Sequence, residues 1–324
     1  MTTRPASPSA EEFLSYIDST PTPFHLCAET IKWLDAAGFR GLSEADQWSL
    51  QPGDKCYYTR NASTLVAFVV GKKYMDHYTS TGIFGGIKIV GAHTDSPVLK
   101  LKPTSKKTAH GYVQVAVECY GGGLWHTWFD RELTVAGSVI VESGGSFERR
   151  LVHVSRPLLR VPNLCIHLQS GEERKQFAPN KENHLVPILS MVEEQLNNTA
   201  AEAAGGAAGA AAGAEGKAGE GGGEGGEADM YGRHAPELLR ILAEELGCAP
   251  KDIVDLELSL CDTQPGQLWG LRNEFLSSPR LDNQAHCYTS VRALIDYASN
   301  DELIDADTDI SLIALFDHEE VRMM

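Results

Sequence analysis

No apolar run in this sequence is long enough to cross a membrane. The longest, near residues 64–71, has the length of a strand, whereas a membrane-spanning helix needs about 20 apolar residues. Residues 1–19 lack both a basic region and an apolar core, which argues against a secretory signal. A basic surplus is absent too, because 28 Lys and Arg face 44 Asp and Glu, for a formal net charge of −16. A nucleic-acid partner is therefore not expected, since binding requires cations that neutralise phosphates.

Cysteine is present but is not arranged for cross-linking. The seven cysteines are odd in number, widely spaced and form no Cys-x-x-Cys pair, so neither a disulfide framework nor a cysteine-ligated zinc site is expected. They are Cys27, Cys56, Cys119, Cys165, Cys248, Cys261 and Cys287. We expect most of them to be buried apolar side chains in a reducing compartment. The cytoplasm is the predicted location, with a vacuolar or organellar address left open.

The order of helix and strand patterns predicts an α/β domain that is interrupted by a β-rich one. Before residue 98 we expect two helices, at about 9–18 and 23–38, and three strands at 56–60, 63–71 and 87–92. From residue 98 the pattern changes to short strands separated by turns, at 112–120, 133–142, 151–154 and 164–168. A helix over 186–196 is expected to follow.

The second half of the chain returns to alternating helix and strand. Residues 199–228 are almost wholly Ala, Gly and Glu, and their dense glycines predict a disordered surface loop. Helix is expected at 236–246 and 283–298, and strand at 254–261 and 311–316. The last of these is a continuous apolar run, which is typical of a buried strand.

Three clusters of acidic and imidazole side chains lie at the ends of these elements. Residues 91–97 (Gly-Ala-His-Thr-Asp-Ser-Pro) follow the strand predicted at 87–92, and residues 317–320 (Asp-His-Glu-Glu) follow the strand at 311–316. Residues 280–283 (Arg-Leu-Asp-Asn) begin the helix at 283–298. Ligands of open α/β sheets gather outside the carboxyl ends of strands, so the first two clusters stand where a site would form.

The residue types in these clusters suit hydrolytic zinc chemistry. Imidazole and carboxylate are good zinc ligands, one carboxylate can bridge two ions, and of two adjacent glutamates one can bind metal while the other takes a proton from water. Each cluster also has a simpler interpretation. His93 and Asp95 could satisfy the backbone of a turn, and Asp282 could cap a helix. Glu319 and Glu320 could be solvated surface, and spacing alone leaves both interpretations open.

Several longer segments carry a family resemblance. Residues 120–133 (Tyr-Gly-Gly-Gly-Leu-Trp-His-Thr-Trp-Phe-Asp-Arg-Glu-Leu) form the longest of these segments, and residues 91–100 form another. Further matching segments are 151–157, 166–169, 184–189, 262–265, 278–283 and 319–321. In these segments the sequence resembles the aspartyl aminopeptidases, a family of two-zinc metallopeptidases. The similarity runs in order from about residue 13 to residue 321, apart from the Ala/Gly-rich loop.

The resemblance implies a zinc-dependent aminopeptidase that removes N-terminal Asp or Glu from peptides, with two Zn²⁺ per complete subunit. His93 would bind one zinc ion, Asp282 would bridge both, and Glu320 would bind the second. Glu319 would be the general base that activates water, and it would also contact the substrate.

The resemblance also implies roles away from the metal ligands. Asp95 would orient His93 through its other ring nitrogen. His167 would contact substrate in the active site of a neighbouring subunit, whereas the residue pattern by itself favours a core histidine in an alternating strand. Dimers of the family assemble into a tetrahedral dodecamer, so a homo-oligomer is expected.

The expected fold is α/β, a doubly wound catalytic domain with an inserted β-rich dimerisation domain. The catalytic domain would comprise 1–97 and 235–324, the dimerisation or lid domain 98–198, and the disordered loop 199–234. Trp125, Trp128 and Phe129 are expected to pack in a core or an interface, since aromatic side chains dominate both.

The sequence departs from the family pattern near residue 321. His318 stands where the family usually has Asn, and Arg322-Met323-Met324 replaces the Gly-Ser that follows Glu-Glu-Val. In the family, a later segment holds a further Asp ligand, a final His ligand and the residues that select an acidic side chain. We therefore expect this chain to be an incomplete, inactive and poorly folded form. Two alternatives stay open: a catalytically dead assembly or regulatory partner of complete subunits, and a related two-zinc peptidase or deacylase.

Overall fold

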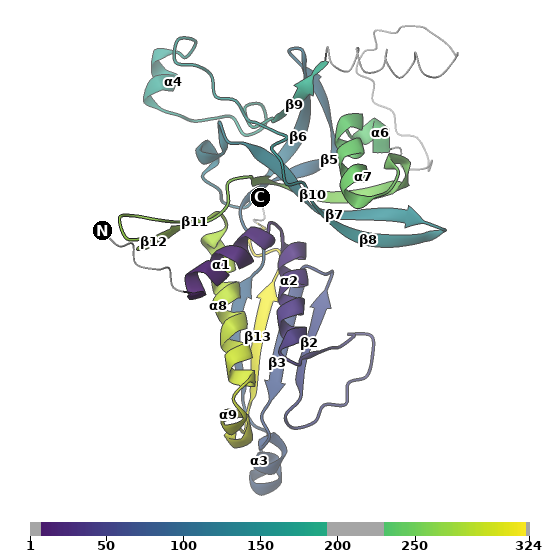
Figure 1. Cartoon of the computed structure of the whole chain (residues 1–324), viewed down its shortest axis with the longest axis vertical. Helices are drawn as coiled ribbons and strands as arrows, with labels where there is room; N and C mark the ends of the chain where they lie inside the picture. Colours follow the sequence, from purple (N-terminus) through teal and green to yellow (C-terminus); the bar gives the residue numbers. More distant parts are fainter. Residues whose placement is uncertain (1–7, 193–229, 322–324) are drawn as a thin grey trace.

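The computed structural model describes residues 8–192 and 230–321. These residues form an elongated molecule in which two units stack end to end (Figure 1). One unit is a five-stranded sheet with helices and the other is built on a six-stranded sheet. Within the described ranges, no helix combines the length and apolar character needed to cross a bilayer.

The five-stranded sheet contains the strands that lead into two of the three clusters. Its order is β1-β2-β3-β13-β4. The bounds are β1 Arg40–Gly41, β2 Lys55–Arg60, β3 Thr64–Val70, β4 Ile87–His93 and β13 Ile310–Phe316. β13 lies between β3 and β4, antiparallel to the first and parallel to the second. The strands predicted at 56–60, 63–71, 87–92 and 311–316 are confirmed to within one residue at each end.

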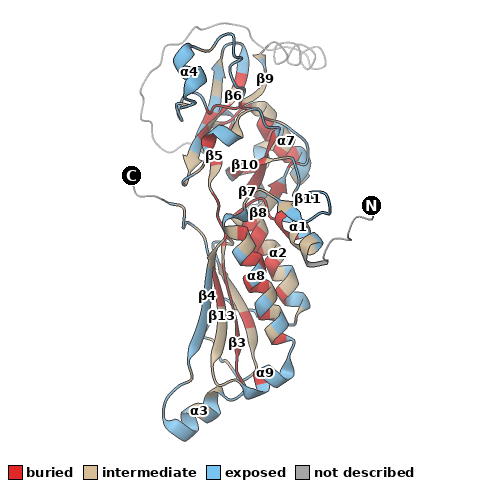
Figure 2. Ribbon diagram, turned by 90° about the vertical axis from the view of Figure 1, so that its left-hand side faces the viewer, coloured by how far each residue is buried: buried red, intermediate tan, exposed pale blue. Residues whose placement is uncertain are grey.

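Helices α1 (Pro8–Ser19), α2 (Pro23–Ala36) and α8 (Leu281–Ala298) cover one face of this sheet (Figure 2). Val291 and Leu294 of α8 pack with Leu65 and Leu315 of the sheet in one buried cluster. On the other face, the loop between β1 and β2 covers Phe68. The α/β class is thereby confirmed, with the long helices of the described residues on one face. β4 is the edge strand and remains exposed along most of its length.

The six-stranded sheet is antiparallel throughout, in the order β8-β7-β10-β5-β6-β9. The bounds are β5 Val98–Ala109, β6 Tyr112–Tyr120, β7 Leu133–Ser143, β8 Ser146–His153, β9 Ile188–Met191 and β10 Ile253–Asp262. Trp125 is buried in its core, and Trp128 and Phe129 pack against it, as expected of these aromatics. The remaining helices of the described residues are α3 Tyr74–Thr81, η1 Trp125–Trp128, α4 Gly171–Lys175, α6 Met230–Arg233, α7 Pro236–Leu246, η2 Pro250–Asp252 and α9 Asp301–Ala306. A separate hairpin pairs β11 Gln267–Trp269 with β12 Phe275–Ser277.

The assignment of all of 235–324 to the catalytic domain is wrong for its first part. α7 and β10 were predicted at the right positions, yet both belong to the six-stranded unit. β10 pairs with β7 along its whole length, and α7 buries Leu238, Leu239 and Leu242 in the core of that unit. A helix followed by a strand looks the same in sequence whichever sheet receives it, because the pairing partner is distant along the chain.

Three local predictions are also wrong, in whole or in part. The helix expected over 186–196 is instead strand β9 as far as Met191, because Ile188 and its neighbours pair with the edge of β6. Most of the disordered loop predicted at 199–234 lies outside the described residues, but its end does not: residues 230–233 form helix α6, and Met230 and His234 are buried. The strand expected at 164–168 is an exposed turn. A short apolar run carries too little periodicity to decide its own conformation.

Candidate metal centre

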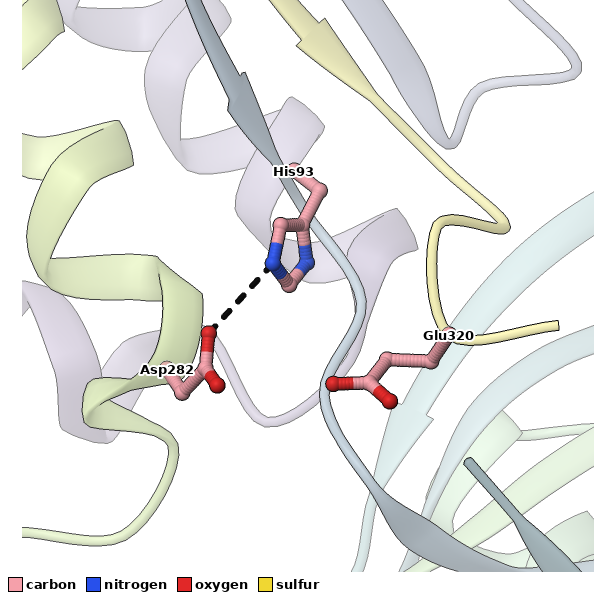
Figure 3. Close-up of side chains that lie close together, drawn as sticks. All are labelled: His93, Asp282 and Glu320. Carbon is pink, nitrogen blue, oxygen red and sulfur yellow. Dashed lines mark ion pairs between the residues drawn. The ribbon is translucent and has the colours of Figure 1, made fainter. Parts of the chain in front are cut away.

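The parallel pairing of β4 with β13 brings the first and third clusters together. In this pairing Phe316 is the partner of His93, so the loops after both strands begin at the same edge of the sheet. The Thr94 amide donates to the Phe316 carbonyl at 2.7 Å, which carries the pairing into the loops. The start of α8 supplies Asp282 at the same edge, and Figure 3 shows the side chains of His93, Asp282 and Glu320 converging.

The three side chains are close enough to share a cation. His93, Asp282 and Glu320 each offer one ligand atom, and these atoms all lie within 4.8 Å of one another. His93 Nε2 is 3.3 Å from Asp282 Oδ1. The Asp282 side chain is 73% exposed and does not cap α8, whose N-cap residue is Arg280. Its carboxylate is therefore free to serve as a ligand.

The second ring nitrogen of His93, Nδ1, faces away from Asp282 and contacts Asp95. Nδ1 lies 2.9 Å from the carbonyl oxygen of Asp95 and 3.4 Å from the carboxylate oxygen Oδ1 of the same residue. A carbonyl can only accept, so Nδ1 carries a proton, and Nε2, which faces Asp282, is the ring nitrogen that could bind a metal ion. The backbone amide of His93 donates to Asn283 Oδ1 at 3.1 Å, which ties the start of α8 to the end of β4.

The Asp95 carboxylate organises the loop that carries the two glutamates. It is almost fully buried, with 3% of its side chain exposed. Its Oδ2 accepts hydrogen bonds from the Glu320 amide at 3.0 Å and from the Tyr120 hydroxyl at 2.6 Å. Its Oδ1 accepts a longer one from the Glu319 amide at 3.4 Å. A buried carboxylate requires such donors, since burial of an unpaired charge is costly.

Tyr120 reaches this carboxylate from the last residue of β6 in the other unit. Burial first, and then the hydrogen bond to Asp95, raise the pKa of the Tyr120 hydroxyl well above its ordinary value. The hydroxyl therefore stays protonated and donates to Asp95 at any physiological pH. The ammonium of Lys100 lies 4.4 Å from the centroid of the Tyr120 ring and packs over its face.

Glu319 lies beside the cluster and is exposed. Its Oε2 is 3.7 Å from His93 Nε2, and 60% of its side chain is accessible. His167 is elsewhere: it belongs to the exposed turn at 166–168, not to a core strand. α4, which begins four residues after His167, lies in Figure 1 at the far end of the six-stranded unit from the five-stranded sheet.

Three contributors to this centre carry no site role in the sequence analysis: Tyr120, Gly122 and Asn283. The Gly122 amide donates to Glu320 Oε2 at 3.3 Å. Tyr120 and Gly122 stand at the start of the 120–133 block. The aromatic residues of that block predicted a role in packing, not in the site. No spacing rule relates these residues to His93, because each contact joins segments that are distant along the chain, and those of Tyr120 and Gly122 also cross between the two units.

The donor set fits zinc. One imidazole and two carboxylates within 4.8 Å of one another match the nitrogen and oxygen ligands of hydrolytic zinc sites, which use three protein ligands and water. The polarised His93 ring and the exposed Glu319 add the orienting contact and the neighbouring base that such sites require.

Comparison with known proteins shows the family to which the chain is similar. Residues 16–322 match the family described as Aminopeptidase I zinc metalloprotease (M18). An aspartyl aminopeptidase of Aspergillus oryzae is 45% identical over 315 residues, which cover 96% of this chain and 60% of the relative. The chain therefore spans about three fifths of the length of that curated relative.

Solved structures show the same fold. The cryo-EM structure of the Ape4 and Nbr1 complex contains a chain that is 36% identical, with a TM-score of 0.80 over 96% of this chain and 54% of that one. The dodecamer of mApe1 from Saccharomyces cerevisiae is 28% identical, with a TM-score of 0.73 over 97% of this chain and 61% of that one.

Replacement of the buried carboxylate should loosen the loop at 317–320. Asp95→Asn turns one acceptor oxygen into an NH₂ group that faces N–H or O–H donors, so we expect a loss of about 1–3 kcal/mol in the free energy of unfolding. Urea denaturation measures that loss, and amide hydrogen exchange should become faster at Glu319 and Glu320. Asp46→Asn, at an exposed position, is the control and should change stability by less than about 0.5 kcal/mol. Unchanged exchange at both amides would contradict the role given to Asp95.

Proposed function

This chain belongs to the aminopeptidase I zinc metalloprotease family (M18), and from that premise we propose that it acts, in its full-length protein, as an aspartyl aminopeptidase. The reaction would be hydrolytic removal of N-terminal Asp or Glu from peptides. The observation that carries the proposal is the convergence of His93, Asp282 and Glu320 within 4.8 Å, beside Glu319. A cytoplasmic location belongs to the same proposal.

Each side chain of the cluster has a distinct task in this proposal. Zinc held by His93, Asp282 and Glu320 would supply Lewis-acid chemistry, which polarises a peptide carbonyl and makes water easier to deprotonate. Glu319 would accept the proton of the attacking water and later deliver it to the leaving amine. Its exposure supports this task, because a base must reach both solvent and substrate. Asp95 would keep the imidazole and the glutamate loop in place.

We further propose a two-ion centre, in which Asp282 would be the ligand that both ions share. The described residues offer one group of three metal-ligand side chains. If Asp282 is shared, each ion has two protein ligands from this group, whereas catalytic zinc generally has three. The proposal therefore requires further ligands beyond the described residues, and the 324-residue chain by itself would be inactive.

Self-association is the remaining part of the proposal. The S. cerevisiae mApe1 structure is a dodecamer, and this chain is similar to it in fold. Several large apolar side chains are exposed on the segment around His167. Exposed apolar groups that cluster on a surface are typical of an interface. Those on this segment are Leu164, Ile166, Leu168 and Phe177. His167 would then reach the active site of a neighbouring subunit and contact the substrate there.

Substitution of the base tests the assigned activity. In the full-length protein, meaning the chain that its complete transcript encodes, Glu319→Gln should lower kcat for Asp- or Glu-linked substrates by about 100-fold or more. Zinc content should stay the same, because the substitution removes a proton acceptor and no proposed ligand. Glu142→Gln, at an exposed position of β7, is the matched control with unchanged kcat. Full activity of Glu319→Gln would refute the assignment of the base. A wild-type protein that binds zinc but does not cleave these substrates would refute the proposed activity.

The ligand count predicts the behaviour of the 324-residue chain expressed alone. After gel filtration in excess zinc, we expect fewer than two bound ions per chain and no turnover of Asp- or Glu-linked substrates, since each ion would lack about one protein ligand. Elemental analysis measures the zinc, and His93→Ala provides the background for adventitious binding. Two equivalents of zinc together with turnover would show that the described ligands suffice.

A complementation experiment tests His167 in trans. His167→Ala should lower the activity of the full-length protein about tenfold or more, the cost of one hydrogen bond to a charged group. His77→Ala on α3 is the control in the other unit. Subunits with His167→Ala keep Glu319, and subunits with Glu319→Gln keep His167, so mixed oligomers should recover activity that neither variant has alone. A mixture no more active than the sum of its parts would contradict the contact between subunits.

A further inference from the structure

The end of β6 touches the metal centre although it belongs to the other unit. Tyr120, its last residue, pairs with Val98, the first residue of β5. Val98 follows His93 by only five positions, so the loop at 94–97 leads directly from the proposed ligand into the six-stranded sheet. The turn at 120–122 therefore lies beside both the His93 loop and the loop that carries Glu320.

Two polar contacts join this turn to the two loops. The Tyr120 hydroxyl donates to Asp95 Oδ2 at 2.6 Å, and the same oxygen accepts the Glu320 amide at 3.0 Å. The Gly122 amide donates to Glu320 Oε2 at 3.3 Å. Glu320 is thus held at both ends: its backbone through Asp95, and its carboxylate by the turn.

Gly121 makes the approach of Glu320 possible. Its φ of +78° is one that residues with a side chain rarely adopt. A Cβ at this position would lie 2.8 Å from Glu320 Oε2, which is shorter than real contacts of a Cβ, and 3.0 Å from Glu320 Cβ, which is tighter than most of them. The glutamate side chain therefore lies directly against the backbone of the turn. A larger residue at 121 would force it away.

We propose that the turn Tyr120–Gly122 is a positioning element for the metal centre. Tyr120 holds the Asp95 carboxylate, and the backbone of Gly121 and Gly122 sets where the Glu320 carboxylate lies relative to His93. The spacing of the ligand atoms then depends on how the six-stranded unit sits on the five-stranded one. This inference rests on the proposed zinc site but not on the peptidase activity. Partners that orient metal ligands typically change metal affinity by about 10–100-fold when they are removed.

The first test compares two Tyr→Phe substitutions on the same strand. In the full-length protein, Tyr120→Phe keeps the ring under Lys100 but removes the donor to Asp95, so zinc affinity should fall about tenfold or more. Tyr112→Phe, at the first residue of β6, should leave zinc affinity unchanged. Competition with a chromophoric chelator measures the affinity, and the absorption spectrum of the Co²⁺ form reports a change in ligand geometry.

The second test compares two Gly→Ala substitutions with the same backbone strain. Gly121 has φ +78° and Gly111 has φ +79°, but a Cβ at 111 would meet nothing within 4 Å. Both variants should lower the melting temperature of the metal-free protein to a similar extent. Gly121→Ala alone should weaken zinc binding, by about 10–100-fold, because it alone displaces Glu320.

The outcomes separate this inference from the proposed activity. The positioning role would be overturned if Tyr120→Phe and Gly121→Ala left zinc affinity unchanged. It would also be overturned if their controls, Tyr112→Phe and Gly111→Ala, lowered zinc affinity by the same factor. Weaker zinc binding confined to these two variants would support it even if the wild-type protein cleaved no peptide. Failure of the wild-type protein to bind zinc would overturn both proposals.

Discussion

The buried carboxylate of Asp95 is the interaction on which the centre depends. It lies in the loop after β4 and accepts hydrogen bonds from the loop after β13 and from the end of β6. These segments are distant along the chain. Because a buried charge is tolerated only when donors surround it, the three segments must come together for any of them to be stable.

This requirement explains the division between buried and exposed groups at the site. Asp95 and Thr94 are buried and make hydrogen bonds to neighbouring segments, whereas the Asp282 and Glu319 side chains are largely exposed beside His93. Side chains that bind metal or move protons must stay accessible, so their positions have to be set by neighbours that are not. The imidazole of His93 shows the same division within one side chain. Its Nδ1 is held by the Asp95 carbonyl, and its Nε2 stays available to a metal ion.

The centre also joins the two units of the molecule. The five-stranded sheet supplies His93 and Glu320, α8 supplies Asp282, and the six-stranded sheet supplies the turn that contacts Glu320. If the turn positions Glu320 as proposed, a movement of one unit relative to the other would change the distance between Glu320 and His93. In the proposed function this makes the β-rich unit part of the metal centre, besides being the surface that carries His167.

The sequence by itself predicted the elements and the residue types of the site. The strands at 56–60, 63–71, 87–92 and 311–316 and the helix at 236–246 agree with the structure because their apolar patterns are long and local. Metal chemistry made the clusters that hold His93, Asp282 and Glu320 candidates, but the family resemblance was needed to assign these residues as ligands. The roles that the family resemblance assigns to Glu319 and His167 remain predictions.

Tertiary structure alone decided which segments meet. That α7 and β10 join the six-stranded sheet and that residues 188–191 form a strand both depend on partners distant in the chain. The same holds for the contacts of Tyr120 with Asp95 and of Gly122 with Glu320, which cross between the units. A local sequence pattern predicts the secondary structure and the chemistry of a residue. Strand pairing and hydrogen bonds between remote segments determine which residues it contacts.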